Sequence, residues 1–179
     1  MQQVFPIYRT GLGQASRRFL PADSSKPCVV GGIIFEGAPG LDAESDGDIV
    51  FHAMCHAITS LSGTPILDGI ARDLCRKDGI TDSAVYLERA LQSLKPQKIV
   101  HISITIEGQR PRFEEKLHAM QEKIARLCHL DTKAVGITVI SGDGLTDFGC
   151  GDGLQSFAMI TTVEMYTDRD SKIGSAGVG

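Results

Sequence analysis

The clearest hydrophobic pattern lies between residues 99 and 107, where apolar and polar side chains alternate. A period of two is typical of a β-strand that buries one face. The apolar positions of this expected strand are Val100, Ile102, Ile104 and Ile106, and its polar positions are His101, Ser103, Thr105 and Glu107. The polar face need not meet solvent, because it can also line an interface between subunits.

Further strands are expected at residues 4–10, 28–35, 135–140 and 154–166. Gly31 and Gly32 predict a turn within the second of these segments. The glycines that follow residue 10 predict that the first strand ends there and that residues 11–18 form a loop. Helical spacing of apolar residues predicts helices at about 50–61, 66–74, 84–94 and 113–127. We found no internal repeat or interdomain linker, so one α/β domain is expected at 1–166, followed by a disordered tail at 167–179.

Residues 44–56 combine an acidic, glycine-containing turn with the start of a helix. Ser45 is expected as the N-cap of this helix, with Asp48 three residues later in an arrangement close to a capping box. His52 and His56 are one turn apart, so they project from the same side of the helix. Two histidines beside carboxylates suit metal binding or phosphate chemistry. Two partly buried histidines that pack against a sheet have the same spacing.

Composition narrows the classes of protein to consider. A chain of 179 residues with 42% apolar and 22% charged residues suits one globular domain. The net charge of −4 argues against a nucleic-acid partner. The apolar runs are shorter than a membrane span and residues 1–3 lack the basic start of a signal peptide, so no membrane partner is expected. The five cysteines are scattered singly, which indicates reduced thiols and a cytoplasmic or plastid-like location.

Four segments carry a resemblance to a known family. They are Arg9-Thr-Gly-Leu-Gly13 with Phe19, Ser45-Asp-Gly-Asp48 through His52-Ala53, Thr105-Ile106 with Gln109 and Pro111, and Gly149 to Gly153. In this order they resemble 2-C-methyl-D-erythritol 2,4-cyclodiphosphate synthase of the non-mevalonate isoprenoid pathway, over roughly residues 8–166. The stretch at 142–153 looks most like a divergent branch found in chlamydia-type bacteria.

The resemblance implies a mixed sheet of the four-stranded type with helices on one face, an α+β arrangement. It also implies a homotrimer, packed sheet-inward around a three-fold axis, with active sites at the subunit junctions. The implied activity is that of a phosphorus–oxygen lyase. The 2-phosphate of 4-diphosphocytidyl-2-C-methyl-D-erythritol 2-phosphate attacks the β-phosphorus, CMP leaves and a cyclic diphosphate forms. Such a reaction depends on positioning and on cations that offset the phosphate charge.

The resemblance further implies two divalent metal ions. A zinc-like ion is held by an Asp-x-His pair and by the histidine that corresponds to His52, and a magnesium- or manganese-like ion bridges the phosphates. Here Ala15 and Arg17 replace the Asp-x-His pair, and a single imidazole is too few ligands for zinc. We therefore expect the zinc-like site to be lost, with a site rebuilt from His52, His56 and Glu44 as the alternative. Arg17 keeps a positive charge there, so substrate affinity is expected to survive while most of the rate is lost.

Substrate contacts are implied for ten positions, and catalytic roles for three. The substrate-binding set is Arg17, Ser45, Gly108, Gln109, Arg110, Pro111, Arg112, Ser141, Gly142 and Asp143, and the catalytic set is Ser141, Glu44 and Asp48. Arg112 is expected to grip a nucleotide phosphate, and Asp143 to hold the magnesium- or manganese-like ion. Structural roles remain open for several of them, as a solvated charge at 112, a tight turn at 141–144 and caps at 45 and 48.

Two other functions stay open at this point. The replacements at Ala15 and Arg17 favour a catalytically inactive trimeric homologue or an engineered scaffold. The matching residues at positions 48, 52, 112 and 143 favour the enzyme. A module that binds a cytidine nucleotide without cleaving it is the third interpretation. Metal content and CMP release distinguish the enzyme from the other two.

Overall fold

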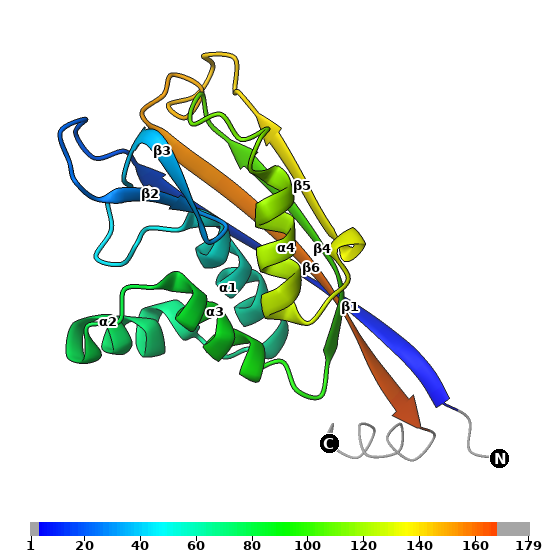
Figure 1. Ribbon diagram of the computed structural model, residues 1–179. Coiled ribbons are helices and arrows are strands. Elements are labelled where there is room, and N and C mark those ends of the chain that lie inside the picture. Colours follow the sequence, from blue (N-terminus) through cyan, green and yellow to red (C-terminus); the bar gives the residue numbers. More distant parts are fainter. Residues whose placement is uncertain (1–3, 168–179) are drawn as a thin grey trace.

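The structure, a computed structural model, describes residues 4–167 (Figure 1). Its centre is a four-stranded sheet in the order β1-β6-β4-β5. The strands span Val4–Arg18 (β1), Gly153–Thr167 (β6), Lys98–Glu107 (β4) and Val135–Ile140 (β5). β6 is antiparallel to both of its neighbours, whereas β4 and β5 are parallel. The expected mixed sheet is therefore confirmed. The tail was predicted to begin at residue 167, but Thr167 is the last residue of β6. Residues 168–179 of the predicted tail lie outside the described part of the chain.

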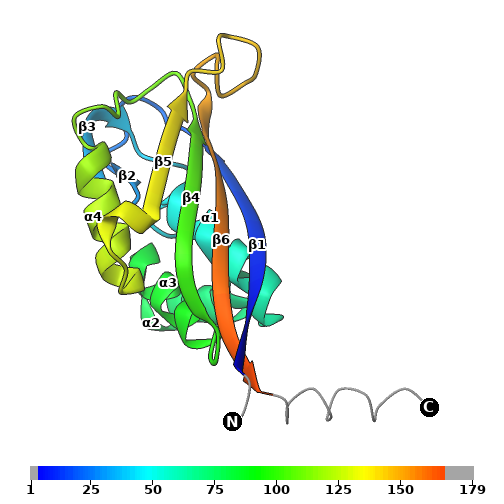
Figure 2. The same ribbon diagram turned by 90° about the vertical axis from the view of Figure 1, so that its right-hand side faces the viewer.

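Helices cover one face of the sheet, and Figure 2 shows the opposite face with no helix of the described residues over it. α1 (Ile49–Ser62) packs across β1 and β6, and α4 (Leu117–Cys128) packs against β5. α3 (Ser83–Gln92) packs on α1. None of the helices within residues 4–167 is long and apolar enough to span a membrane.

Smaller elements complete the described chain. They are the hairpin of β2 (Pro27–Val30) and β3 (Ile33–Pro39), a π-helical turn η1 (Ile66–Ala71), a short helix α2 (Arg72–Asp78) and a 3-10 turn η2 (Thr132–Ala134). The turn predicted at Gly31 and Gly32 is confirmed, because both residues have positive φ between β2 and β3. The single helix expected at 66–74 is instead two consecutive helical segments, and the helix expected from residue 113 begins four residues later.

The alternating strand predicted at 99–107 is confirmed as β4, with one correction. The three isoleucines of its apolar pattern are buried in the core. Val100 is 38% exposed instead. The pairing of β4 with β6 is irregular between Ile99 and His101, and such a bulge interrupts the alternation of sides.

The loop predicted at 11–18 is wrong, because β1 continues through these residues. Two glycines of this stretch serve close packing instead of a turn. A Cβ on Gly13 would lie 2.1 Å from the carbonyl oxygen of Ala53, and one on Gly11 would lie 2.2 Å from that of Ala57. The glycines therefore let β1 pass directly against the backbone of α1.

The N-cap predicted at Ser45 is also wrong. The cap of α1 is Asp48, whose carboxylate accepts hydrogen bonds from two N–H groups of the first turn. The hydroxyl oxygen of Ser45 instead accepts a hydrogen bond from the N–H of Gly47 at 3.2 Å. The helix expected at about 50–61 is confirmed as α1, which ends at Ser62 where Gly63 forms a left-handed C-cap with φ of 71°.

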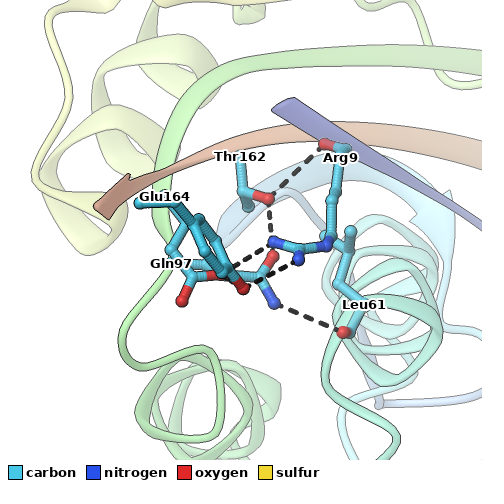
Figure 3. A network of polar contacts seen from close by, with 6 residues as sticks. Arg9, Leu61, Gln97, Thr162 and Glu164 are labelled. Atoms are coloured by element: carbon cyan, nitrogen blue, oxygen red, sulfur yellow. Dashed lines mark hydrogen bonds and ion pairs between the residues drawn. The ribbon is translucent and has the colours of Figure 1, made fainter. Parts of the chain in front are cut away.

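A polar network joins α1 to the sheet near the C-terminal end of β6 (Figure 3). Thr162 Oγ1 donates to Gln97 Oε1 at 2.7 Å, and Gln97 Nε2 donates to the carbonyl oxygen of Leu61 at 3.4 Å. Arg9 Nη1 donates to Glu164 Oε2 on the neighbouring strand at 2.7 Å. These bonds satisfy polar groups at the margin of the apolar core.

The uncovered face of the sheet, called the open face below, carries large apolar side chains. Leu12 and Met159 lie directly opposite each other on β1 and β6 and are 63% and 44% exposed. Phe157, which is 41% exposed, lies opposite Thr105. The polar positions expected on β4 therefore share this face with an apolar stripe. Exposed apolar surface of this kind is typical of contacts between subunits.

Candidate active site

A cavity of about 340 Å³, called the α1 cavity below, opens beside the first two turns of α1. Among the residues that line it are Arg17, Glu44, Ser45, His52 and His56. Five of the predicted site residues therefore meet at one place. The two histidines share it, as their one-turn spacing predicted.

His52 has a defined tautomer in this cavity. Its Nδ1 lies 2.7 Å from the carbonyl oxygen of Asp48, and because a carbonyl only accepts hydrogen bonds, Nδ1 carries the proton. Nε2 therefore keeps its lone pair. Burial lowers the pKa of His52, and the positive charge of Arg17 lowers this pKa as well. A neutral imidazole is thus the form that lines the cavity.

Asp48 is fully buried, and its carboxylate is engaged by the backbone. Oδ1 accepts from the N–H groups of Gly31, Val50 and Phe51 at 3.0, 3.0 and 3.1 Å, and Oδ2 accepts from that of Gly32 at 2.6 Å. Burial raises the pKa of Asp48 to about 7, while several of these N–H groups act in the opposite direction. The side chain therefore ties the start of α1 to the β2–β3 turn. This placement favours the role of a cap over the catalytic role that the resemblance implied.

Glu44 is held by an exposed ion pair. Arg76 Nη2 donates to its Oε1 at 2.8 Å, and Arg76 Nε donates to its Oε2 at 3.0 Å. The Arg76 guanidinium holds the pKa of Glu44 below its usual range. Within residues 4–167, no group of three or more His, Cys, Asp or Glu side chains is arranged to hold a metal ion. The described residues therefore do not arrange His52, His56 and Glu44 as metal ligands, and a rebuilt site remains a prediction.

The residues at positions 15 and 17 do not fit a zinc-like ion either. Ala15 is buried and has no donor atom. Directly opposite it on β6 lies Ser156, whose buried hydroxyl has no hydrogen-bond partner among the described residues. Arg17 lines the same cavity as His52, and its positive charge repels a cation. The chemistry of this cavity is therefore derived without a metal ion at His52.

The other predicted residues lie at the carboxyl ends of β4 and β5, in a surface called the β4–β5 rim below (residues 108–112 and 141–143). The N–H of Gly108 donates to the carbonyl oxygen of Ile140 at 3.0 Å. Arg110 Nη2 donates to the carbonyl oxygen of Gly151 at 3.2 Å. The Arg110 guanidinium also lies 4.8 Å above the ring centre of Phe19, within cation–π range.

The turn at the end of β5 presents a hydroxyl and a carboxylate together. Ser141 Oγ donates to Asp143 Oδ1 at 2.9 Å, and Asp143 has a left-handed φ of 48°. Gly142 packs against Gly149, since a Cβ on Gly142 would lie 2.9 Å from the Cα of Gly149. Gln109 and Arg112 are exposed and Pro111 is half-buried, so most of the rim is accessible to a ligand or to another chain.

Within one chain the structure does not bring these two groups together. The residues of the β4–β5 rim are absent from the lining of the α1 cavity. Sequence reasoning missed the other residues that line it, among them four with polar or thiol-bearing side chains, Asp68, Arg72, Cys75 and Tyr86. They lie in η1, α2 and α3. Asp68 and Arg72 had one weak signal, because residues 66–74 follow closely on the helix of the two histidines, and Cys75 and Tyr86 had none.

The arrangement defines a class of protein. A mixed sheet with helices on one face, and a cavity that pairs arginine side chains with a neutral histidine, suits a ligand that carries phosphate groups. The chain belongs to the YgbB family, whose sequence profile matches residues 8–163.

Two relatives and a solved structure agree with this assignment. The 2-C-methyl-D-erythritol 2,4-cyclodiphosphate synthase of Chlamydia muridarum is 55% identical over 159 residues, which are 88% of this chain and 89% of that protein. That of Chlamydia felis is 52% identical over 159 residues, which are 88% of this chain and 90% of that protein. A CDP-bound structure of 2C-methyl-D-erythritol-2,4-cyclodiphosphate synthase is similar with a TM-score of 0.75, 24% identity and coverage of 86% of this chain and 99% of that chain. The resemblance and the fold are thereby confirmed.

Proposed function

We propose that the chain binds 4-diphosphocytidyl-2-C-methyl-D-erythritol 2-phosphate and converts it, with release of CMP, to the cyclic diphosphate. The names of the two Chlamydia relatives support this reaction. The observation that carries the proposal is the meeting of Arg17, Ser45 and His52 at the α1 cavity. The related structure with bound CDP supports a cytidine nucleotide as the ligand class. All five cysteines are free thiols, which supports a reducing, cytoplasmic location.

As part of the same proposal, three copies assemble with their open faces inward. The α1 cavity of one copy then meets the β4–β5 rim of its neighbour at each junction. This assembly accounts for two features that one chain leaves unexplained, the apolar stripe around Leu12 and Met159 and the separation of the two groups of site residues. A ligand that spans the junction contacts both groups.

Each part of the rim has a proposed task. The backbone from Gly108 to Pro111 contacts the cytosine and ribose, and Arg112 binds the nucleotide phosphate. The Ser141 hydroxyl donates to the transferring phosphate, in place of its present bond to Asp143. Asp143 holds a magnesium- or manganese-like ion that offsets the charge of the diphosphate, since such ions bind through one or two carboxylates and substrate phosphates.

The expected rate is low. The zinc-like ion of the family supplies Lewis-acid polarisation, and the residues at positions 15 and 17 do not fit it. The chain therefore acts mainly through positioning and charge. Ala15 and Arg17 also favour a second candidate function, a trimeric nucleotide-binding protein that releases no CMP.

Three measurements on the purified chain test the proposal. Native mass spectrometry is expected to give a trimer, and calorimetric titration with CDP to give binding. CMP release from the substrate is expected, at a rate well below that of a metal-loaded relative measured in parallel. CDP binding without CMP release would favour the nucleotide-binding protein. A monomer that does not bind CDP would contradict both functions.

A further inference from the structure

Arg17 lies at the wall of the α1 cavity with His52. The guanidinium and the imidazole therefore border the same cavity, within reach of one bound ligand. The imidazole of His52 donates from Nδ1 to the Asp48 carbonyl oxygen at 2.7 Å. Among the described residues, Arg17 and Arg72 are the two arginines that line this cavity.

The Arg17 guanidinium is largely unengaged within the described chain. Of its five N–H donors, the structure assigns one bond, from Nη1 to the carbonyl oxygen of Ser16 at 2.7 Å. No carboxylate within residues 4–167 forms an ion pair with it at 4.0 Å or less. Arg76, by contrast, is bound by both oxygens of Glu44. Arg18 lies 3.7 and 3.8 Å from Asp147 and Asp152.

Two acids of the described chain, Glu44 and Asp68, line the cavity with Arg17, but Glu44 is paired with Arg76 and neither acid forms an ion pair with Arg17 at 4.0 Å or less. Ala15, two residues earlier on the same side of β1, is a buried methyl group. The side chain opposite it is Ser156, whose hydroxyl has no partner within the described residues. A carboxylate at position 15 would lie within reach of both groups, and its absence leaves the charge of Arg17 available to a ligand.

From these observations we infer that the Arg17 guanidinium takes the place of a divalent cation, so that the chain binds the diphosphate of a nucleotide without a metal ion at His52. The inference rests on the proposed function, and it assigns recognition of the diphosphate group to the positive charge of Arg17. A planar guanidinium with several N–H groups free of protein partners can bind phosphate oxygens by two parallel hydrogen bonds. A guanidinium does not accept the lone pair of a phosphate oxygen as a metal ion does. It therefore supports binding of the diphosphate but does not polarise its P–O bonds as a Lewis acid.

Calorimetric titration of the intact chain with CDP tests the inference. The chain is first freed of zinc by dialysis against EDTA, and the titrations are then done in buffer that contains MgCl₂, without and with added ZnCl₂. The dissociation constant is expected to change less than about threefold between these conditions. Arg17→Gln is expected to weaken binding about 10- to 100-fold, as for loss of a charge-assisted hydrogen bond. Arg17→Lys, which keeps the charge without the planar fork, is expected to recover part of the affinity.

Arg18→Ala is the matched control, because it removes the neighbouring arginine and the same unit of charge outside the α1 cavity. It is expected to bind CDP within about threefold of the unchanged chain. Far-UV circular dichroism checks that each variant is folded. CDP binding that requires added zinc, or that is equal in the unchanged chain and in Arg17→Gln, would overturn the inference while leaving the proposed function intact. Failure of CDP to bind under every condition would overturn both.

Discussion

Ser156 and Thr162 lie on the same buried face of β6, but only Thr162 uses its hydroxyl group. Thr162 Oγ1 donates to Gln97 Oε1 at 2.7 Å (Figure 3), whereas Ser156 Oγ has no partner within the described chain. A buried hydroxyl without a hydrogen bond lowers the stability of the folded state. Removing a hydroxyl that does form a hydrogen bond leaves its partner without one, which also lowers stability.

Substitutions at these two positions are therefore expected to change stability in opposite directions. Ser156→Ala is expected to raise the free energy of unfolding by about 1 kcal/mol, and Thr162→Val to lower it by about 1–2 kcal/mol. Urea denaturation of both variants measures the difference. A loss of stability in Ser156→Ala would mean that its hydroxyl is bonded in the folded protein.

Gly13 is expected to be intolerant of even one added carbon. In Gly13→Ala, the Cβ would lie 2.1 Å from the carbonyl oxygen of Ala53 and 2.3 Å from the amide nitrogen of Ala57. The strand and helix must separate, which is expected to cost about 3 kcal/mol or more. Gly136→Ala on β5 is the control, because its nearest atom is 3.9 Å away. Equal thermal midpoints for the two variants would contradict the close packing of β1 on α1.

Gly13 also shows where sequence reasoning stops. Alternating isoleucines predicted β4 because a period of two is a local property. A glycine, by contrast, has the same local signature whether it allows a turn or the close approach of another backbone. Only the position of α1 decides between the two, so β1 was predicted to end too early.

The choice between Ser45 and Asp48 as the cap of α1 has a similar reason. Both residue types cap helices well. Asp48 is the cap because its carboxylate also accepts hydrogen bonds from the N–H groups of Gly31 and Gly32, which lie far from it in the sequence. For the candidate site, the segment with both histidines could be predicted from spacing alone. Arg72 and Tyr86 could not, since no short motif connects α2 and α3 with that cavity.

Asp48 is expected to make stability depend on pH. Burial raises its pKa to about 7 in the folded chain, above the ordinary value of 3.8. The folded state therefore binds this proton more tightly than the unfolded state, and the free energy of unfolding falls as the pH rises from about 4 to about 7. Asp48→Asn has no titratable group at this position. Its free energy of unfolding is therefore expected to change less with pH over that range. Chemical denaturation at several pH values measures both slopes, and equal slopes would show that Asp48 does not titrate there.

The proposed assembly makes the open face sensitive to charge. Leu12→Glu places a carboxylate within the apolar stripe, opposite Met159, where assembly would bury it without a partner. The variant is expected to have about one third of the mass of the unchanged trimer, with unaltered circular dichroism. Ile34→Glu is the control, because Ile34 is 53% exposed on β3, outside the open face. A trimer that persists in Leu12→Glu would place the subunit contact elsewhere.

The double substitution Ala15→Asp with Arg17→His is expected to create zinc binding. It supplies a carboxylate and an imidazole on the side of β1 that meets His52, and three protein ligands are usual for a zinc site with an open position. Elemental analysis after dialysis is expected to give about one zinc per chain, compared with almost none for the unchanged chain. Ala15→Asp alone is the control, since the new carboxylate then pairs with Arg17.

Ser156 gives this experiment a second readout. Its hydroxyl lies opposite position 15 and is free to donate to a carboxylate introduced there. Hydrogen bonds to ligating carboxylates orient them, and their loss typically weakens metal binding about 10- to 100-fold. Adding Ser156→Ala to the double variant is therefore expected to weaken zinc affinity, although the same change stabilises the unchanged chain. If zinc affinity is the same with and without Ser156, the hydroxyl does not reach the carboxylate, and another group orients it.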